Sequence, residues 1–163
     1  MSKTRNIYID TQYLHAFIFP EKCDEDMFCK EILKKAIYNR SSMIQIPFVV
    51  VGETINNIKR KSITKSQEED VIRNLLTLLE RDNINLSPPI QHCFRIANEI
   101  KGSSHYLDDT DVLITAHALC DPTATHFLVN DEKILTSSRI KDINSKLKTE
   151  GFREYNLKLI SEF

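Results

Sequence analysis

The sequence predicts an α/β fold, in which a central parallel sheet is covered by helices on both faces to give three α/β/α layers. Short apolar segments with strand character alternate with longer segments whose apolar residues recur at helical spacing. This alternation is typical of parallel strands joined by crossover helices. Two of the strand-like segments, NIYID and FLVND, end on an acid, and ligands of open α/β sheets bind beyond the carboxyl ends of the strands.

The composition is that of an ordinary globular protein. A chain of 163 residues can bury a core without disulfides or a structural metal, so we expect one domain over residues 1–163. The formal net charge of -1 disfavours nucleic-acid binding through bulk electrostatics, which leaves local patches or metal ions as the means of contact. No apolar leader and no apolar run of membrane-spanning length occurs, which predicts a cytoplasmic protein without a membrane partner.

Cysteine and glycine usage excludes several kinds of site. The four cysteines form no CxxC pair, which disfavours a structural zinc site and favours isolated reduced thiols; they are Cys23, Cys29, Cys93 and Cys120. The three glycines are isolated, so neither a Walker loop nor a GxGxxG turn can form.

The first half of the chain predicts two strands and three helices. Strands are expected over 6–10 and 43–46, with a helix over 24–39 between them. Segment 47–55 is ambiguous, because its β-branched run favours a strand whereas Pro47 suits the first turn of a helix. We take it as a helix, partly on the family resemblance given below. Ser66 and Glu69 predict a capping box for the next helix.

The second half continues the alternation. A strand is expected over 84–86, followed by a helix that is capped by Ser87, begins at Pro88 and ends at Gly102. Its inward face is predicted to hold Ile90, Phe94, Ala97 and Ile100. A helix over 109–120, a strand over 126–129 and a helix over 138–148 follow, and the tail is expected to add an edge strand.

Four acids occupy matching positions in this scheme. Asp10 and Asp131 each follow a strand, so both face the crevice at the carboxyl edge of a parallel sheet. Glu53 lies early in one helix and Asp111 in the first turn of another. Carboxylates brought together repel one another unless they are protonated or bind a cation. Mg²⁺ or Mn²⁺ suits such an all-oxygen set, and water on these ions can attack phosphodiesters.

Each acid also has an ordinary structural explanation. Residues 108–111 could simply cap a helix, Asp10 and Asp131 could begin loops, and Glu53 could be solvated. The joint placement of the four favours the metal site. Two other signals are weaker: His117 between two alanines is better explained as a structural histidine, and the basic stretch 59–65 as a solvated face rather than an RNA contact.

The chain resembles the PIN-domain ribonucleases, a family of toxin components and RNA-processing nucleases. Segment 111–118, DVLITAHA, fits the family pattern D-x-x-I-x-A-x-A, which is its most specific mark. Asp10, Glu53 and Asp131 match the positions of the other three family acids. The resemblance implies a PIN-like α/β/α fold and a metal-dependent endoribonuclease that uses Mg²⁺ or Mn²⁺, often as a homodimer. For a toxin it also implies a small antitoxin-like partner, whereas an RNA-maturation nuclease fits equally well.

The sequence departs from the family pattern near the site. Many members carry Thr or Ser where this chain has Val129. Asp108 and Asp109 are additional neighbours, and either could replace or assist Asp111 as a metal ligand. The alternative function is therefore a non-catalytic PIN-like module that binds RNA or protein. A response-regulator domain is disfavoured, because it needs a pair of acids beside the first strand, where only Asp10 occurs.

Overall fold

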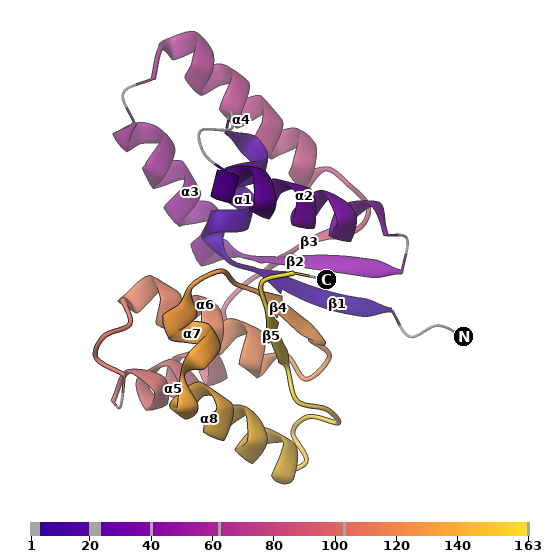
Figure 1. The fold of residues 1–163 in the computed structure, drawn as a ribbon, viewed down its shortest axis with the longest axis vertical. Helices are drawn as coiled ribbons and strands as arrows, with labels where there is room; N and C mark the ends of the chain where they lie inside the picture. The colour runs from indigo at the N-terminus through magenta and orange to yellow at the C-terminus, as the bar shows by residue number, and fades with distance from the viewer. Residues whose placement is uncertain (1–3, 20–23, 40, 62, 103, 163) are drawn as a thin grey trace.

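Five parallel strands form the centre of the fold, in the order β3-β2-β1-β4-β5. The structure is a computed structural model and describes residues 4–19, 24–39, 41–61, 63–102 and 104–162 (Figure 1). The strands are β1 (Arg5–Ile9), β2 (Ser42–Pro47), β3 (Ile84–Ser87), β4 (His126–Leu128) and β5 (Lys158–Ile160). The predicted parallel sheet is confirmed, including the edge strand from the tail.

Helices cover both faces of the sheet. One side holds α1 (Thr11–Ile18), α2 (Asp24–Tyr38), α3 (Phe48–Arg60) and α4 (Lys65–Leu79). The other side holds α5 (Gln91–Lys101), α6 (Asp109–Cys120), α7 (Glu132–Thr136) and α8 (Ser138–Thr149) (Figure 1). The three-layer α/β/α arrangement is thus confirmed, and the segment after Pro47 is a helix. The extent of the domain over residues 1–163 stays a prediction.

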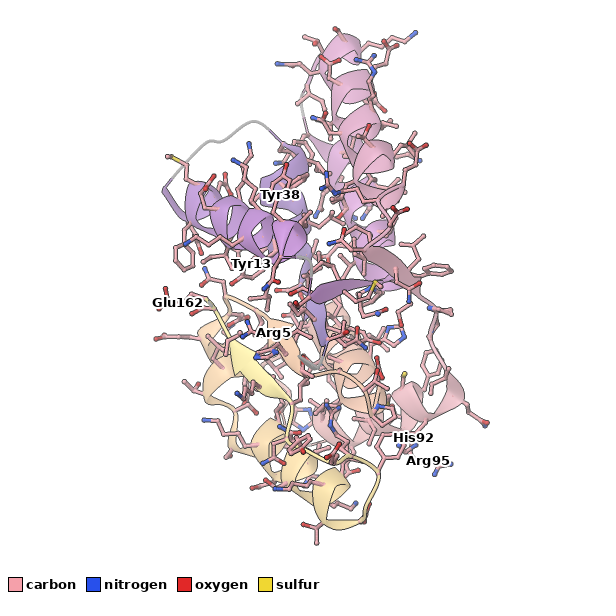
Figure 2. All side chains as sticks on the ribbon, turned by 90° about the vertical axis from the view of Figure 1, so that its right-hand side faces the viewer. Arg5, Tyr13, Tyr38, His92, Arg95 and Glu162 are labelled. Carbon is pink, nitrogen blue, oxygen red and sulfur yellow. The ribbon has the colours of Figure 1, made fainter. Side chains whose placement is uncertain are left out.

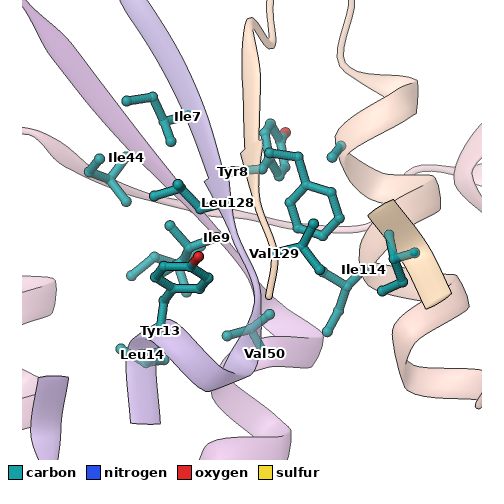
Figure 3. Close-up of a cluster of buried hydrophobic side chains, with 14 of the residues drawn as sticks. Ile7, Tyr8, Ile9, Tyr13, Leu14, Ile44, Val50, Ile114, Leu128 and Val129 are labelled. Atoms are coloured by element: carbon teal, nitrogen blue, oxygen red, sulfur yellow. The ribbon is translucent and has the colours of Figure 1, made fainter. Parts of the chain in front are cut away.

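The strand alternation divides the core between the two helical layers. Ile7 and Ile9 of β1 point toward the layer that contains Tyr13 of α1, whereas Tyr8 points toward Ile114 of α6 (Figure 3). All of these side chains are at most 2% exposed. Side chains of successive strand residues point to opposite faces, so a central strand covered on both sides is apolar throughout.

Two helices that begin at the predicted strand-end acids were not predicted. Only Asp10 separates β1 from α1, and α7 begins immediately after Asp131. Helix α1 has only eight residues (TQYLHAFI), five of them buried, and its polar residues Thr11, Gln12 and His15 are too few to give the periodic pattern of a longer amphipathic helix. Helix α7 has only five residues and is too short to show a period.

The predicted capping box of α4 was two residues too far along the chain. Thr64 is the N-cap, and its hydroxyl accepts a hydrogen bond from the Gln67 N–H at 3.3 Å. The Gln67 side chain accepts in return from the Thr64 N–H at 2.9 Å. Ser66, the predicted cap, lies within the first turn.

The predicted start of α5 was also wrong, and its predicted inward face was right for two of four residues, Ala97 and Ile100. Ser87 ends β3, and the helix begins at Gln91 after two prolines. Ile90 and Phe94 are 53% and 50% exposed, and Cys93 and Ile96 are buried in their place; the buried stripe consists of Cys93, Ile96, Ala97 and Ile100. These four residues keep the helical spacing expected of an amphipathic helix.

The expected structural roles of the thiols and of His117 are consistent with the fold. Cys29, Cys93 and Cys120 are buried, and Cys23 lies outside the described residues. His117 is 4% exposed, and its Nε2 donates to the carbonyl oxygen of Pro88 at 2.8 Å. Among the described helices, none is long and apolar enough to cross a membrane.

Candidate active site

The strand order creates a crevice beside β1. The chain passes from β1 outward to β2 and β3, then returns to place β4 on the other side of β1. Ligands of open α/β sheets bind at such a reversal, beyond the carboxyl ends of the strands. Asp10 follows β1 there, and its N–H donates to the carbonyl oxygen of Leu128 in β4 at 3.0 Å. The first and last of the four predicted acids thus emerge from neighbouring strands.

Both strand-end acids cap the helices that follow them. The Asp10 carboxylate accepts a hydrogen bond from the Thr11 N–H at 2.7 Å, and the Asp131 carboxylate accepts from the Lys133 N–H at 2.7 Å. A side-chain oxygen at the N-cap satisfies a helix N–H that has no partner within the helix. The positive end of each helix dipole also favours the negative charge.

The other two acids come from helices on opposite sides of the sheet. Glu53 lies on α3, which begins directly after β2, and its Oε2 accepts from the Thr11 hydroxyl at 2.5 Å. Asp111 lies in the first turn of α6, and its N–H donates to the capping carboxylate of Asp108 at 2.9 Å. The caps therefore fix the backbone at three of the four acids, and Thr11 holds the fourth.

All four predicted acids line a single cavity of about 320 Å³. Its described lining consists of Asp10, Thr11, Gln12, His15, Glu53, Asn57, Asp111 and Asp131. No lysine or arginine is among these described lining residues, so the cavity gathers four carboxylates without either of these cationic side chains in its lining.

Burial and mutual repulsion raise the pKa values of two of the acids. Burial raises the pKa of Asp10 to about 7, and the charges of Asp111, Glu53 and Asp131 add to the effect of burial, while the Thr11 N–H opposes it. Burial likewise raises the pKa of Asp111 to about 6, with further contributions from Asp108, Asp131 and Glu53. A cation in the cavity would favour the ionised form of each.

The family model of the PIN domain matches residues 7–137, which is most of the chain. The chain belongs to the PIN-domain family. PIN domains are generally nucleases, so membership supports hydrolysis of nucleic acid at the level of the family. The predicted resemblance is confirmed.

A comparison with solved structures finds the same fold in a distant relative. The crystal structure of VapBC2 from Rickettsia felis, bound to a DNA fragment from their promoter, contains a similar chain with a TM-score of 0.61 and 16% sequence identity. The match covers 95% of this chain and 97% of that chain. A similarity at this identity shows the fold. No curated protein matches the sequence.

The donor set of this PIN domain fits a hard divalent cation that retains water. Carboxylate and hydroxyl oxygens are the ligands that Mg²⁺ and Mn²⁺ prefer. Within the described part of the chain, no group of three or more His, Cys, Asp or Glu side chains is arranged to hold one ion directly. Mg²⁺ commonly binds through one or two carboxylates and keeps several waters, so carboxylates spread around a cavity suit it.

The two additional acids next to Asp111 have other contacts. Asp108 caps α6 and accepts from the N–H groups of Thr110 and Asp111. Asp109 is 87% exposed in its side chain and pairs with Lys101, with 2.8 Å between Oδ1 and Nζ. Neither residue lines the cavity.

Sequence reasoning missed the residues that lie beside the acids. Val129 is fully buried (Figure 3), whereas the Thr11 hydroxyl contacts Glu53 from a different element. His15 and Asn57 also line the cavity, each one turn along a helix from a residue at the site. The i, i+4 spacing of Glu53 and Asn57 was a usable signal, but that of Thr11 and His15 lay in the helix that was not predicted.

Proposed function

We propose that this PIN domain is a metal-dependent endoribonuclease. The observation that carries the proposal is the convergence of four carboxylates from four separate elements on one cavity at the topological reversal of the sheet. The raised pKa values of Asp10 and Asp111 add support, because they reveal negative charge that a cation would stabilise.

The proposed ligands of one or two Mg²⁺ or Mn²⁺ ions are Asp10, Glu53, Asp111 and Asp131. When bound there, such an ion supplies Lewis-acid stabilisation of the phosphate charge and lowers the pKa of an attacking water. Thr11 orients Glu53 through its hydroxyl hydrogen bond, and Asp108 fixes the first turn of α6. The described lining residues include no serine, cysteine or lysine, which fits water as the attacking group.

The proposed substrate is RNA, which would reach the cavity along a local basic surface. Lys59 and Arg60 are exposed at the end of α3, beyond Glu53 and Asn57 on the same helix. Such a patch can hold a phosphate backbone even though the whole chain has a formal charge of only -1.

The proposed protein partner is a small antitoxin-like chain in the cytoplasm. The similarity to a chain of the VapBC2 structure supports this choice over a solitary nuclease. An arginine from the partner would satisfy the carboxylates through paired charge-assisted hydrogen bonds and exclude the cation. Inhibition by the partner would then be competitive with metal.

A homodimer is also part of the proposal. Phe48 at the start of α3 and Phe94 of α5 are 49% and 50% exposed, and both line one small apolar cavity with Val49 and Leu113. Large apolar side chains that cluster on the surface are typical of protein contacts. A second copy of the chain is the occupant we propose.

The test is cleavage of a mixed pool of structured and unstructured RNA, with a matched DNA pool beside it. We expect cleavage of RNA with Mg²⁺ or Mn²⁺, none with chelator, and loss of cleavage in Asp10→Asn with the fold retained. Equal activity of Asp10→Asn and the unsubstituted protein would refute the assigned site. A folded protein that cleaves neither pool with either metal would favour the non-catalytic binding module.

A further inference from the structure

A second cavity, of about 410 Å³, lies at the other end of α6 from the acid cavity. Its lining includes Cys93 of α5, His117 and Cys120 in the last turn of α6, and Asp121 at the cap of that helix. No described residue lines both cavities. The proposed nuclease site therefore leaves the two thiols and the histidine of the second cavity without a role.

Packing of α5 against α6 brings the two thiols together, although their positions in the sequence form no cysteine pair. The Cys120 thiol donates a hydrogen bond to the Cys93 sulfur. Each residue is only 2% exposed, yet each forms part of the cavity wall. A molecule small enough to enter the cavity therefore reaches thiols that the outer surface of the protein does not present.

His117 is placed to take the proton of the Cys93 thiol. Its Nε2 donates to the carbonyl oxygen of Pro88 at 2.8 Å, and because a carbonyl oxygen can only accept, Nε2 carries a proton. His117 also shares a hydrogen bond with Cys93, for which the second ring nitrogen, Nδ1, remains. A thiol, a base and a third group that orients the base form the usual arrangement of an activated cysteine.

The start of α5 favours a negative charge on Cys93. This residue lies in the first turn of the helix, and the N-cap, Ile90, supplies no side-chain hydrogen bond, so the positive end of the helix dipole acts on the thiol without a capping group. The hydrogen bond from Cys120 lowers the pKa of the Cys93 thiol most, burial opposes this, and the hydrogen bond with His117 lowers it further. Donating that hydrogen bond, together with burial, raises the pKa of Cys120. The pair thus consists of a thiolate at Cys93 and a protonated thiol at Cys120.

We propose that Cys93 is a modification site for hydrogen peroxide, and that Cys120 converts the oxidised sulfur into a disulfide that joins α5 to α6. The geometry that carries the inference is an activated thiol beside a second thiol in the wall of one cavity. Cysteines of this kind, next to a second cysteine, are typical of peroxide-sensitive sites. Hydrogen peroxide is uncharged and little larger than water, so it can enter the cavity. The inference is independent of the proposed function, because it uses no residue of the acid cavity.

The proposed reaction has two steps. In the first, the Cys93 sulfur attacks one oxygen of the peroxide, an S–O bond forms and the O–O bond breaks, and the leaving hydroxide takes the proton held by His117 to give water. In the second, the Cys120 sulfur attacks the Cys93 sulfur, an S–S bond forms and the S–O bond breaks, and the leaving hydroxyl takes the Cys120 proton to give a second water. Two thiols and one peroxide thus give one disulfide and two waters.

The experiment treats the reduced, folded full chain with hydrogen peroxide at neutral pH. Trypsin digestion and mass spectrometry without reductant then identify the linked cysteines, because trypsin leaves Cys93 in segment 82–95 and Cys120 in segment 102–133. We expect these two segments to be joined after treatment and to separate again when a reductant is added.

Two variants divide the reaction into its steps. Cys120→Ser removes the second step, so sulfenic acid should accumulate at Cys93 and be captured by dimedone when the protein is unfolded in the presence of this reagent. His117→Gln keeps a donor for the Pro88 carbonyl but removes the base, and should slow the oxidation of Cys93 by at least about tenfold. A purely structural role of His117 would leave this rate unchanged.

Cys29 provides a matched control, since it is a buried thiol in the other helical layer. It lies on α2, close to Tyr13 of α1. Figure 2 shows Tyr13 on the opposite side of the sheet from His92, the neighbour of Cys93 in α5. Cys29→Ala is expected to leave both the rate of oxidation and the position of the disulfide unchanged, and thermal unfolding of every variant checks the fold.

Three results would overturn the inference: no disulfide between the two segments of the folded protein, equal rates of oxidation at Cys29 and Cys93, or equal rates in His117→Gln and the unsubstituted protein. The first result would leave the two thiols and His117 as a structural hydrogen-bonded cluster. Sulfenic acid that forms at Cys120 in Cys93→Ser as fast as at Cys93 in Cys120→Ser would contradict the assignment of Cys93 as the group that attacks the peroxide.

Discussion

The two ends of α6 carry opposite charges, and they differ in how those charges are satisfied. At the N-terminus, Asp111 faces other carboxylates across the acid cavity. At the C-terminus, the buried Arg153 guanidinium donates to the carbonyl oxygens of Ala118, Leu119 and Asp121 at 2.9 to 3.1 Å, and also to that of Ala124. The helix dipole favours both charges, acids at its start and a cation at its end.

The charge of Arg153 is therefore structural, whereas the charge of Asp111 is available to a ligand. Arg153 is 3% exposed and its donors are paired with backbone oxygens, which a buried guanidinium requires. Gly151 makes this possible, because its φ of 76° turns the chain after α8 and brings Arg153 back toward α6. Among the described residues, no comparable set of donors surrounds the Asp111 carboxylate. Burial and the neighbouring acids therefore raise its pKa.

The largest expected effect comes from the acid end. Asp111→Asn should lower metal-dependent RNA cleavage by at least about a hundredfold, because catalytic charge stabilisation is worth several kcal/mol. Asp109→Asn, in the same helical turn but paired with Lys101, should change the rate by less than about threefold. Initial rates on one RNA substrate give both numbers. Comparable losses of cleavage rate in the two variants would contradict the assignment of Asp111, and not Asp109, to the catalytic cavity.

At the other end of α6, the expected effect falls on stability. Arg153→Met should lower the free energy of unfolding by about 3 kcal/mol or more, since it leaves several buried carbonyl oxygens without a donor. Arg153→Lys should lower it less, because the charge stays while the planar fork is lost. Urea unfolding measures both changes. Cleavage per folded molecule should be unaffected, and a selective loss of cleavage would show that the two ends are coupled.

A smaller effect is expected in the pH dependence of stability without metal. The pKa of Asp10 is about 7 in the folded protein and about 4 in an unfolded chain, so between these pH values the folded state binds more protons. The contribution of Asp10 to the free energy of unfolding should therefore be most favourable below about pH 4 and should fall as the pH rises to about 7.

Asp10→Asn tests the sign of this dependence. The variant should be more stable than the unsubstituted protein at about pH 8 without metal, by about 1–3 kcal/mol, because burial and neighbouring acids no longer oppose a charge. Thermal unfolding at several pH values with chelator present gives the comparison. A variant that is less stable than the unsubstituted protein at every pH would contradict the inference that the ionised Asp10 side chain destabilises the metal-free fold.

The sequence predicted the acids better than it predicted their surroundings. A carboxylate at the end of an apolar strand, such as Asp10 or Asp131, is conspicuous because the sheet topology fixes where it points. His15 and Asn57 follow no such rule, and only the packing of α1 against α3 brings them to the same cavity. Tertiary contacts of this kind leave no local signal.

The errors in element boundaries have a similar origin. The sequence at Ser87 and Pro88 satisfies a local rule for a helix start, but pairing with Pro47 in β2 keeps Ser87 in the sheet. The inward face of α5 then follows from packing against α6, which takes Cys93 instead of Phe94. Helix α6 was predicted with its correct bounds, because its cap, its acids and its apolar run agree.

The most direct test of the acid cavity is calorimetric titration with Mn²⁺ at about pH 6.5, in two buffers of different ionisation enthalpy. Because Asp10 is largely protonated near that pH, binding should release a proton to the buffer, and the observed heat should depend on the buffer. Asp10→Asn should bind Mn²⁺ at least about tenfold more weakly and without that proton. Binding that is equally tight in the variant, or no binding to the unsubstituted protein, would contradict the account.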